Sequence, residues 1–191
     1  MKLFESLKGY RKFLKTDSNF KEIVFFSEKS NYFNFFAPLI KKLINKKINT
    51  SFVTSDKKDP VFEIKSKYLK TFFIGDGILR TYFFANLKCK NFILTMPDLG
   101  ENFLKKSPFC KNYIYMFHSL ISSTLAYKNK AFKNYDTFFC VGQHHFRELE
   151  EFFKKNNEIE KKRLLKIGYF KLDEIIKTKD NKKINNNQIL I

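Results

Sequence analysis

The three histidines of this sequence are its side chains best suited to moving a proton near neutral pH, because an unperturbed imidazole titrates at about pH 6.5. One of them, His118, ends an apolar run at residues 113–117, and a Ser/Thr-rich segment follows at residues 119–124. The run predicts a buried strand, and the segment predicts the start of a helix. Because open α/β sheets bind ligands where strands end and helices begin, His118 is a candidate general base, with a structural histidine as the alternative.

His144 and His145 stand in the first turn of a helix predicted at residues 143–155. The amino end of a helix attracts anions, so both are candidates to contact a phosphate group of a substrate. The alternative is that they cap the helix and pack locally. Adjacent histidines do not share one face of a helix, as a pair of metal ligands three or four residues apart would. We therefore expect no metal site here.

Asp98 and Ser119 are further candidates for substrate binding. Asp98 follows a predicted strand, and Ser119 follows His118 directly. Because the carboxyl ends of parallel strands share one edge of a sheet, both would face the same crevice; a turn is the alternative role for Asp98. The helix at residues 143–155 also carries charged residues, Glu148 among them, which indicate a solvated face.

Apolar runs and helical patterns alternate along the chain and would position these side chains. Strands are expected at residues 23–27, 91–96, 113–117 and 136–141, among others, and helices at residues 34–45, 122–132 and 143–155. Strands alternating with helices over this length predict an α/β fold, with a Rossmann-like, doubly wound parallel sheet of roughly six strands.

Several motifs of well-known chemistry are missing. No Gly-x-Gly-x-x-Gly follows the first strand, and no P-loop, His-Glu-x-x-His or Gly-x-Ser-x-Gly motif occurs. The cysteines are far apart and lack zinc-ligand spacing, which argues against a zinc site or a disulfide framework: they are Cys89, Cys110 and Cys140. We expect no cofactor, and neither hydride transfer, ATP hydrolysis nor serine hydrolysis.

The chain is strongly basic, with a formal net charge of +18. Such a charge attracts anionic partners: nucleic acid, an acidic membrane surface or phosphate-bearing substrates. The lysines are spread along the whole chain and accompany no nucleic-acid-binding motif. We therefore expect no nucleic-acid partner, although a basic nucleic-acid-binding protein stays an alternative.

A basic amphipathic helix is expected at residues 3–14, within a first segment at residues 1–18. Two roles are open for it: packing against the domain, or contact with anionic lipid headgroups. No signal peptide and no apolar stretch of about 20 residues occurs. We expect a cytoplasmic protein, held peripherally at the inner face of the cell membrane.

The rest of the chain divides into a domain and a polar tail. Residues 19–176 form the predicted Rossmann-like domain, and residues 177–188 form an Asn- and Lys-rich linker. Residues 189–191 are apolar again and predict the start of a second domain that is cut short. A terminal strand of the same sheet is the alternative.

Three segments carry a family resemblance: Phe117-His118-Ser119, residues 135–142 (Tyr-Asp-Thr-Phe-Phe-Cys-Val-Gly) and residues 167–173 (Ile-Gly-Tyr-Phe-Lys-Leu-Asp). They resemble the amino-terminal domain of the CDP-glycerol glycerophosphotransferases, whose Gly-Tyr-Pro-x-x-Asp segment is similar to the last of them. The family usually has glycine at the position of Ser119 and proline at that of Phe170. The resemblance implies the amino-terminal half of a glycosyltransferase-B architecture.

The resemblance also implies a reaction in the synthesis of teichoic-acid-type cell-surface polymers. His118 would take the proton of an acceptor hydroxyl, which would attack the β-phosphorus of CDP-glycerol or a related CDP-alcohol and expel CMP. The acceptor would be lipid-linked, and most of the donor site would lie in the second domain, so that this chain alone would be inactive. The alternatives are a nucleotide-sugar transferase of the same architecture and a binding domain without catalysis.

Overall fold

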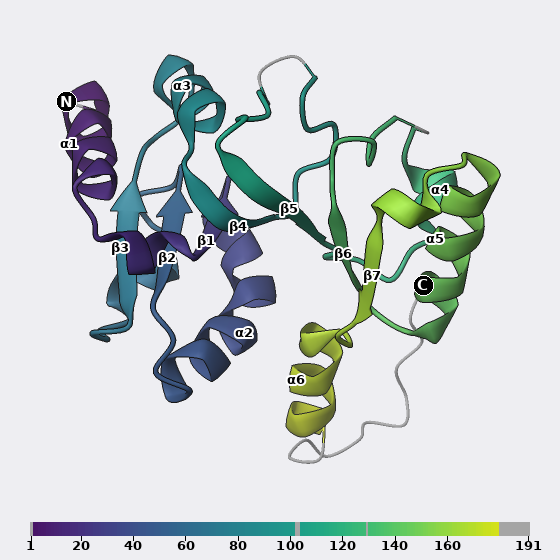
Figure 1. Cartoon of the computed structure of the whole chain (residues 1–191). Helices are drawn as coiled ribbons and strands as arrows, with labels where there is room; N and C mark the ends of the chain where they lie inside the picture. The colour runs from purple at the N-terminus through teal and green to yellow at the C-terminus, as the bar shows by residue number, and fades with distance from the viewer. Residues whose placement is uncertain (1, 102–103, 129, 180–191) are drawn as a thin grey trace.

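A seven-stranded, wholly parallel sheet forms the centre of the protein (Figure 1). The computed structural model describes residues 2–101, 104–128 and 130–179. The strands are β1 (Ile23–Ser27), β2 (Thr50–Thr54), β3 (Leu69–Phe73), β4 (Cys89–Leu94), β5 (Cys110–Met116), β6 (Thr137–Cys140) and β7 (Arg163–Lys166). They lie in the order β3-β2-β1-β4-β5-β6-β7. The expected α/β fold with a Rossmann-like, doubly wound sheet is confirmed.

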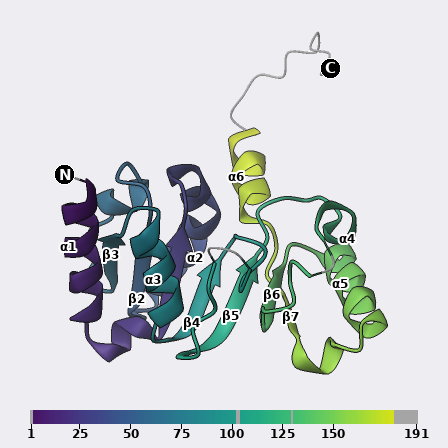
Figure 2. The same ribbon diagram turned by 90° about the horizontal axis from the view of Figure 1, so that it is seen from above.

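Helices cover both faces of this sheet. Three of them bury residues in the core on one face: α1 (Lys2–Leu14), α3 (Ile78–Asn86) and α5 (Gln143–Lys155). The core on the other face contains residues of α2 (Phe33–Asn45). The remaining helical elements are α4 (Ser123–Ala126), α6 (Phe170–Lys179), η1 (Ser18–Lys21), η2 (Ser30–Tyr32), η3 (Pro60–Glu63) and η4 (Ile159–Lys161). Figures 1 and 2 place α1 beside β3 at one end of the sheet and α5 near β7 at the other.

Phenylalanine side chains fill both cores, because strands covered on both faces are apolar at successive positions. Phe25 and Phe26 are adjacent in β1 and fully buried, yet their side chains point to opposite faces. Phe25 packs against Phe36 of α2 with ring centroids 5.6 Å apart. Phe26 packs against Phe84 of α3 at 4.8 Å. The alternation along β1 therefore places one ring in each of the two cores.

The order of the strands reverses between β1 and β4. Strands β2 and β3 lie on one side of β1, and β4 to β7 lie on the other. In doubly wound sheets, ligands bind at this reversal, in the crevice outside the carboxyl ends of the strands. The loops that follow β1, β4 and β5 therefore define the edge where a functional site is expected.

Helix α1 lies close against β3 because a glycine faces the strand. A Cβ atom built on Gly9 would lie 1.8 Å from the carbonyl oxygen of Phe73. Tyr10 and Phe13 are buried on the same side of the helix, whereas Leu3 is 68% exposed. Packing against the domain, one of the two roles expected for this helix, is therefore observed, and part of its apolar surface stays in solvent.

Two segments differ from the sequence-based expectations. The helix expected at residues 122–132 is a single turn, α4, because the hydroxyls of residues 122–124 bind α5 and Tyr127 is extended. Residues 177–179 belong to α6 and not to the predicted linker. The rest of that linker, with the apolar run at residues 189–191, lies outside the described residues.

Candidate functional site

His118 lies at the carboxyl edge of the sheet, just beyond the end of β5. The preceding residue, Phe117, is buried, and its ring packs against the ring of His145 in α5, with centroids 4.1 Å apart. This contact anchors the chain where it leaves β5 and leaves His118 half-buried. The structure thus places His118 at the end of a buried strand, as the sequence predicts.

Three aromatic side chains from segments distant in sequence lie against His118. The ring of Tyr32 in η2 meets the imidazole edge-to-face at a centroid distance of 5.2 Å, and the ring of Phe35 in α2 does so at 5.8 Å. The hydroxyl of Tyr169, after β7, donates a hydrogen bond to the carbonyl oxygen of His118 at 3.0 Å. The loops after β1, β5 and β7 therefore meet at this residue.

Burial lowers the pKa of His118 below its ordinary value, because the charged imidazolium is poorly solvated there. The ring is therefore neutral at pH 7. Its Nδ1 atom is buried and has no hydrogen-bond partner in the described part of the chain. Buried polar atoms of folded proteins nearly always have a partner. A neutral imidazole can accept a proton from a ligand, or hydrogen-bond to it, once the ligand reaches one of the ring nitrogens.

A groove of about 600 Å³ lies between α2 and α6, next to these aromatic rings. Its charged lining residues are Lys41, Lys171, Lys177 and Glu174, and His118 is not part of the lining. The ammonium group of Lys171 lies 5.5 Å from the centroid of the Phe35 ring, so the groove and the aromatic rings share a positive border. Such a border suits an anionic ligand.

His145 is buried and packs locally at the start of α5. The ring is 1% exposed. Its Nδ1 atom accepts the backbone N–H of Val141 at 3.3 Å, so that in the neutral ring Nε2 carries the proton and donates it to Oγ of Ser123 at 2.5 Å. Burial lowers the pKa of His145 to about 4. Local packing, the alternative role of this residue, is observed, and its expected contact with substrate stays a prediction.

Glu148, assigned to a solvated face from the sequence, instead holds the start of α4. Its Oε1 atom accepts hydrogen bonds from Oγ of Ser122 at 2.5 Å and from the backbone N–H and Oγ1 of Thr124 at 2.9 and 2.7 Å. Burial alone would raise the pKa of this carboxyl, but the hydrogen bonds outweigh it and the pKa is lowered.

Among the described residues, no group of three or more His, Cys, Asp and Glu could hold a metal ion.

The other candidate residues do not contact His118. Asp98 is a turn residue, its alternative role: its φ is 59°, and its N–H donates to the carbonyl oxygen of Ala131 at 3.0 Å. Ser119 is half-buried, and His144 is exposed on the first turn of α5. Within the described ranges, no hydrogen bond, ion pair or ring contact joins Asp98, Ser119 or His144 to the His118 side chain.

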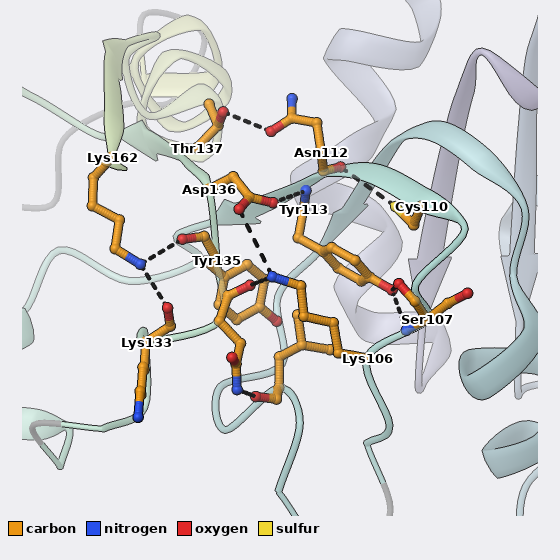
Figure 3. Close-up of polar contacts among 12 residues, drawn as sticks. Lys106, Ser107, Cys110, Asn112, Tyr113, Lys133, Tyr135, Asp136, Thr137 and Lys162 are labelled. Carbon is orange, nitrogen blue, oxygen red and sulfur yellow. Dashed lines mark hydrogen bonds and ion pairs between the residues drawn. The ribbon is translucent and has the colours of Figure 1, made fainter. Parts of the chain in front are cut away.

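A second polar cluster lies at the amino edge of β5, β6 and β7 (Figure 3). Asp136 accepts the backbone N–H of Tyr113 at 2.8 Å. Lys162, whose side chain is 5% exposed, donates to the carbonyl oxygens of Lys133 and Tyr135 at 2.6 and 2.8 Å. Burial lowers the pKa of Lys162. These contacts stabilise the loop before β6, and because the strands are parallel they lie at the edge of the sheet opposite the candidate site.

Comparison with known proteins found no matching family model, no matching curated protein and no matching solved structure. Membership of the family that the three sequence segments resemble therefore stays a prediction, and the candidate site is inferred from its geometry alone.

Proposed function

We propose that this chain is the acceptor-binding domain of a phosphotransferase and that His118 is its general base. The observation that carries the proposal is the state of one side chain. His118 is neutral, half-buried and unpaired at Nδ1, at the carboxyl edge of a doubly wound sheet. General-base assistance needs a neutral group with a free nitrogen, and such help contributes about 10²- to 10⁴-fold to a reaction rate.

In the proposed reaction, His118 accepts the proton of an acceptor hydroxyl. The hydroxyl oxygen forms a new bond to the β-phosphorus of a CDP-alcohol such as CDP-glycerol, and CMP leaves with the electron pair of the broken P–O bond. Lys171, beside the groove between α2 and α6, would attract the phosphate groups of the acceptor. The resemblance to the glycerophosphotransferases supports this donor, with most of the donor site in a second domain.

Helix α1 would hold the protein at an anionic membrane surface, where a lipid-linked acceptor resides. Leu3 and Phe4 are 68% and 74% exposed at its amino end, and Lys8, Arg11 and Lys12 are exposed along it. Apolar residues beside cations suit the boundary between headgroups and acyl chains. Within the described residues, no helix is long and apolar enough to cross a bilayer.

Calorimetric titration with glycerol 3-phosphate, a mimic of a glycerol-phosphate acceptor, tests the proposal. We expect binding to the wild-type chain, affinity weakened about tenfold or more in His118→Ala, which is the loss of one good hydrogen bond, and unchanged affinity in the exposed control His144→Ala. We also expect no turnover of CDP-glycerol by this chain alone. Equal affinity in wild type and His118→Ala, or no binding to either, would contradict the proposal.

A binding domain without catalysis is the second candidate, and the aromatic rings favour it. Tyr32 and Phe35 offer flat apolar surfaces beside the imidazole, which suit a ligand that is stacked and not transformed. His118→Gln separates the two candidates in the presence of the second domain: glutamine keeps hydrogen bonding but accepts no proton. If His118→Gln still binds the ligand but has lost the transfer that the wild type performs, the transferase is supported. If both proteins bind the ligand and neither performs the transfer, the binding domain is supported.

A further inference from the structure

Cys89 and Cys110 form a pair of thiols across two central strands. Cys89 begins β4, Cys110 begins β5, and the register of the two parallel strands sets these residues directly opposite each other. Their sulfur atoms are 3.4 Å apart. The thiol of the third cysteine, Cys140 in β6, contacts the backbone carbonyl oxygen of Phe138 at 3.9 Å.

The backbone geometry of this pair is that of residues that a disulfide can join. Neighbouring strands lie about 4.8 Å apart, and disulfide-bonded cysteines have Cα atoms about 4.4–6.8 Å apart. The sulfur atoms are already 3.4 Å apart. Formation of the bond would bring them to about 2.05 Å.

The two thiols are unequal. Cys89 donates its S–H hydrogen to the sulfur of Cys110, which lowers the pKa of Cys110 and raises that of Cys89. Cys110 is therefore the first of the pair to become a thiolate, the form of cysteine that reacts with oxidants. Burial raises the pKa of Cys140 to about 11, so it stays a thiol.

Access to the pair comes from the amino edge of the sheet. Cys89 and Cys110 are 6% and 9% exposed, whereas Cys140 is fully buried. Exposed residues flank each member of the pair, Lys88 and Lys90 around the start of β4 and Phe109 and Lys111 around the start of β5. Figure 3 shows Cys110 at the end of β5 that carries Asn112, close to the loop before the strand.

We propose that Cys89 and Cys110 are a redox-active pair that a peroxide converts to an intramolecular disulfide. The Cys110 thiolate attacks one peroxide oxygen, the O–O bond breaks, and the protonated other oxygen leaves as water, or as an alcohol from an organic peroxide. The Cys110 sulfenic acid is then attacked by the sulfur of Cys89, which loses its proton, and a water molecule leaves. Two thiols are oxidised by two electrons, and one peroxide is reduced.

Peptide mapping by mass spectrometry without reduction tests the proposal, on the folded full chain treated with hydrogen peroxide and then alkylated in denaturant. We expect a peptide pair joined through Cys89 and Cys110, lighter than the two free peptides by two hydrogen atoms, with Cys140 alkylated. Cys140→Ala, the matched control, should form the same link. Cys89→Ser should leave Cys110 as a sulfenic acid that dimedone labels.

Two results would overturn the proposal. One is that Cys89 and Cys110 both remain alkylatable after a peroxide dose that converts free glutathione completely. The other is that Cys110 is oxidised to sulfinic acid at the same rate in the wild-type chain and in Cys89→Ser, because a neighbouring thiol that forms the disulfide must protect Cys110 from further oxidation. Circular dichroism of each variant checks that the sheet is intact.

Discussion

The hydroxyl of Tyr169 donates a hydrogen bond to the carbonyl oxygen of His118 at 3.0 Å, although 51 residues separate the two in sequence. This contact joins the loop after β7 to the loop after β5, on which the candidate base stands. The orientation of His118 therefore depends on the loop after β7 as well as on the loop after β5.

Tyr169→Phe should lower the free energy of unfolding by about 0.5–1.5 kcal/mol, because it removes this hydrogen bond and keeps the ring. It should also weaken the binding of glycerol 3-phosphate, since the backbone of His118 loses a support. Urea unfolding and calorimetry measure the two effects. Tyr82→Phe is the control, because Tyr82 is 54% exposed. An equal loss of stability and of affinity in Tyr169→Phe and Tyr82→Phe would show that the hydrogen bond to His118 contributes to neither.

Acidification should destabilise the protein through His145. Burial lowers the pKa of this residue from 6.5 to about 4 in the folded state. Between these values the unfolded chain binds the proton and the folded chain does not, so stability is complete above pH 6.5 and is lost as the pH falls toward 4. The loss approaches about 3 kcal/mol. Urea unfolding at several pH values measures it.

The matched variants for this pH dependence are His145→Gln and His144→Gln. His145→Gln should be less stable at pH 7, because glutamine cannot fill both hydrogen bonds of the ring, but its stability should fall less steeply with acidification. His144→Gln should keep the wild-type pH dependence, since His144 is exposed. An unchanged pH slope in His145→Gln would contradict this account of the residue.

Gly9→Ala should destabilise the protein, against the usual trend in helices. Alanine at a helical glycine normally stabilises by up to about 1 kcal/mol. Here the added Cβ would lie 1.8 Å from the carbonyl oxygen of Phe73, and α1 would have to move away from β3. Overpacking of this kind costs about 1–3 kcal/mol, which outweighs the helical gain. Thermal unfolding measures the result, with Lys12→Ala as the exposed control. A more stable Gly9→Ala would show that α1 does not dock as described.

Charge reversal in α1 should weaken binding to anionic vesicles. Each cation near an acidic membrane surface contributes about 1 kcal/mol, so the triple variant Lys8, Arg11, Lys12→Glu should bind at least about tenfold more weakly. Flotation with phosphatidylserine vesicles measures it. The control makes the same charge change at the carboxyl end of α2, where Lys41, Lys42 and the capping residue Lys46 are also exposed. Equal losses in both variants would indicate general electrostatic attraction and no specific role of α1.

Local patterns were enough to predict the layered fold and the position of His118. The apolar runs of β1 and β5 are continuous because both faces are covered, and the helix at residues 143–155 has the predicted bounds. A strand followed by hydroxyl-bearing residues placed His118 at the carboxyl edge. These features depend on residues that are close in sequence.

The partners of the candidate site could not be predicted, because they come from loops distant in sequence. Nothing near Tyr32 or Phe35 in the sequence indicates that their rings meet His118. The burial and hydrogen bonding of His145 depend on the packing of α4 against α5, which brings Ser123 to its ring. The pairing of Cys89 with Cys110 likewise required the register of β4 against β5.

The NMR titration of the histidine side chains tests the central claim most directly. In the isotope-labelled chain, His118 should titrate below 6.5, and its imidazole signals should move on addition of glycerol 3-phosphate. The signals of the buried His145 should stay in place, which makes this residue an internal control. A His118 that titrates at or above 6.5, or whose signals do not respond to glycerol 3-phosphate, would contradict its assignment as the acceptor-side base.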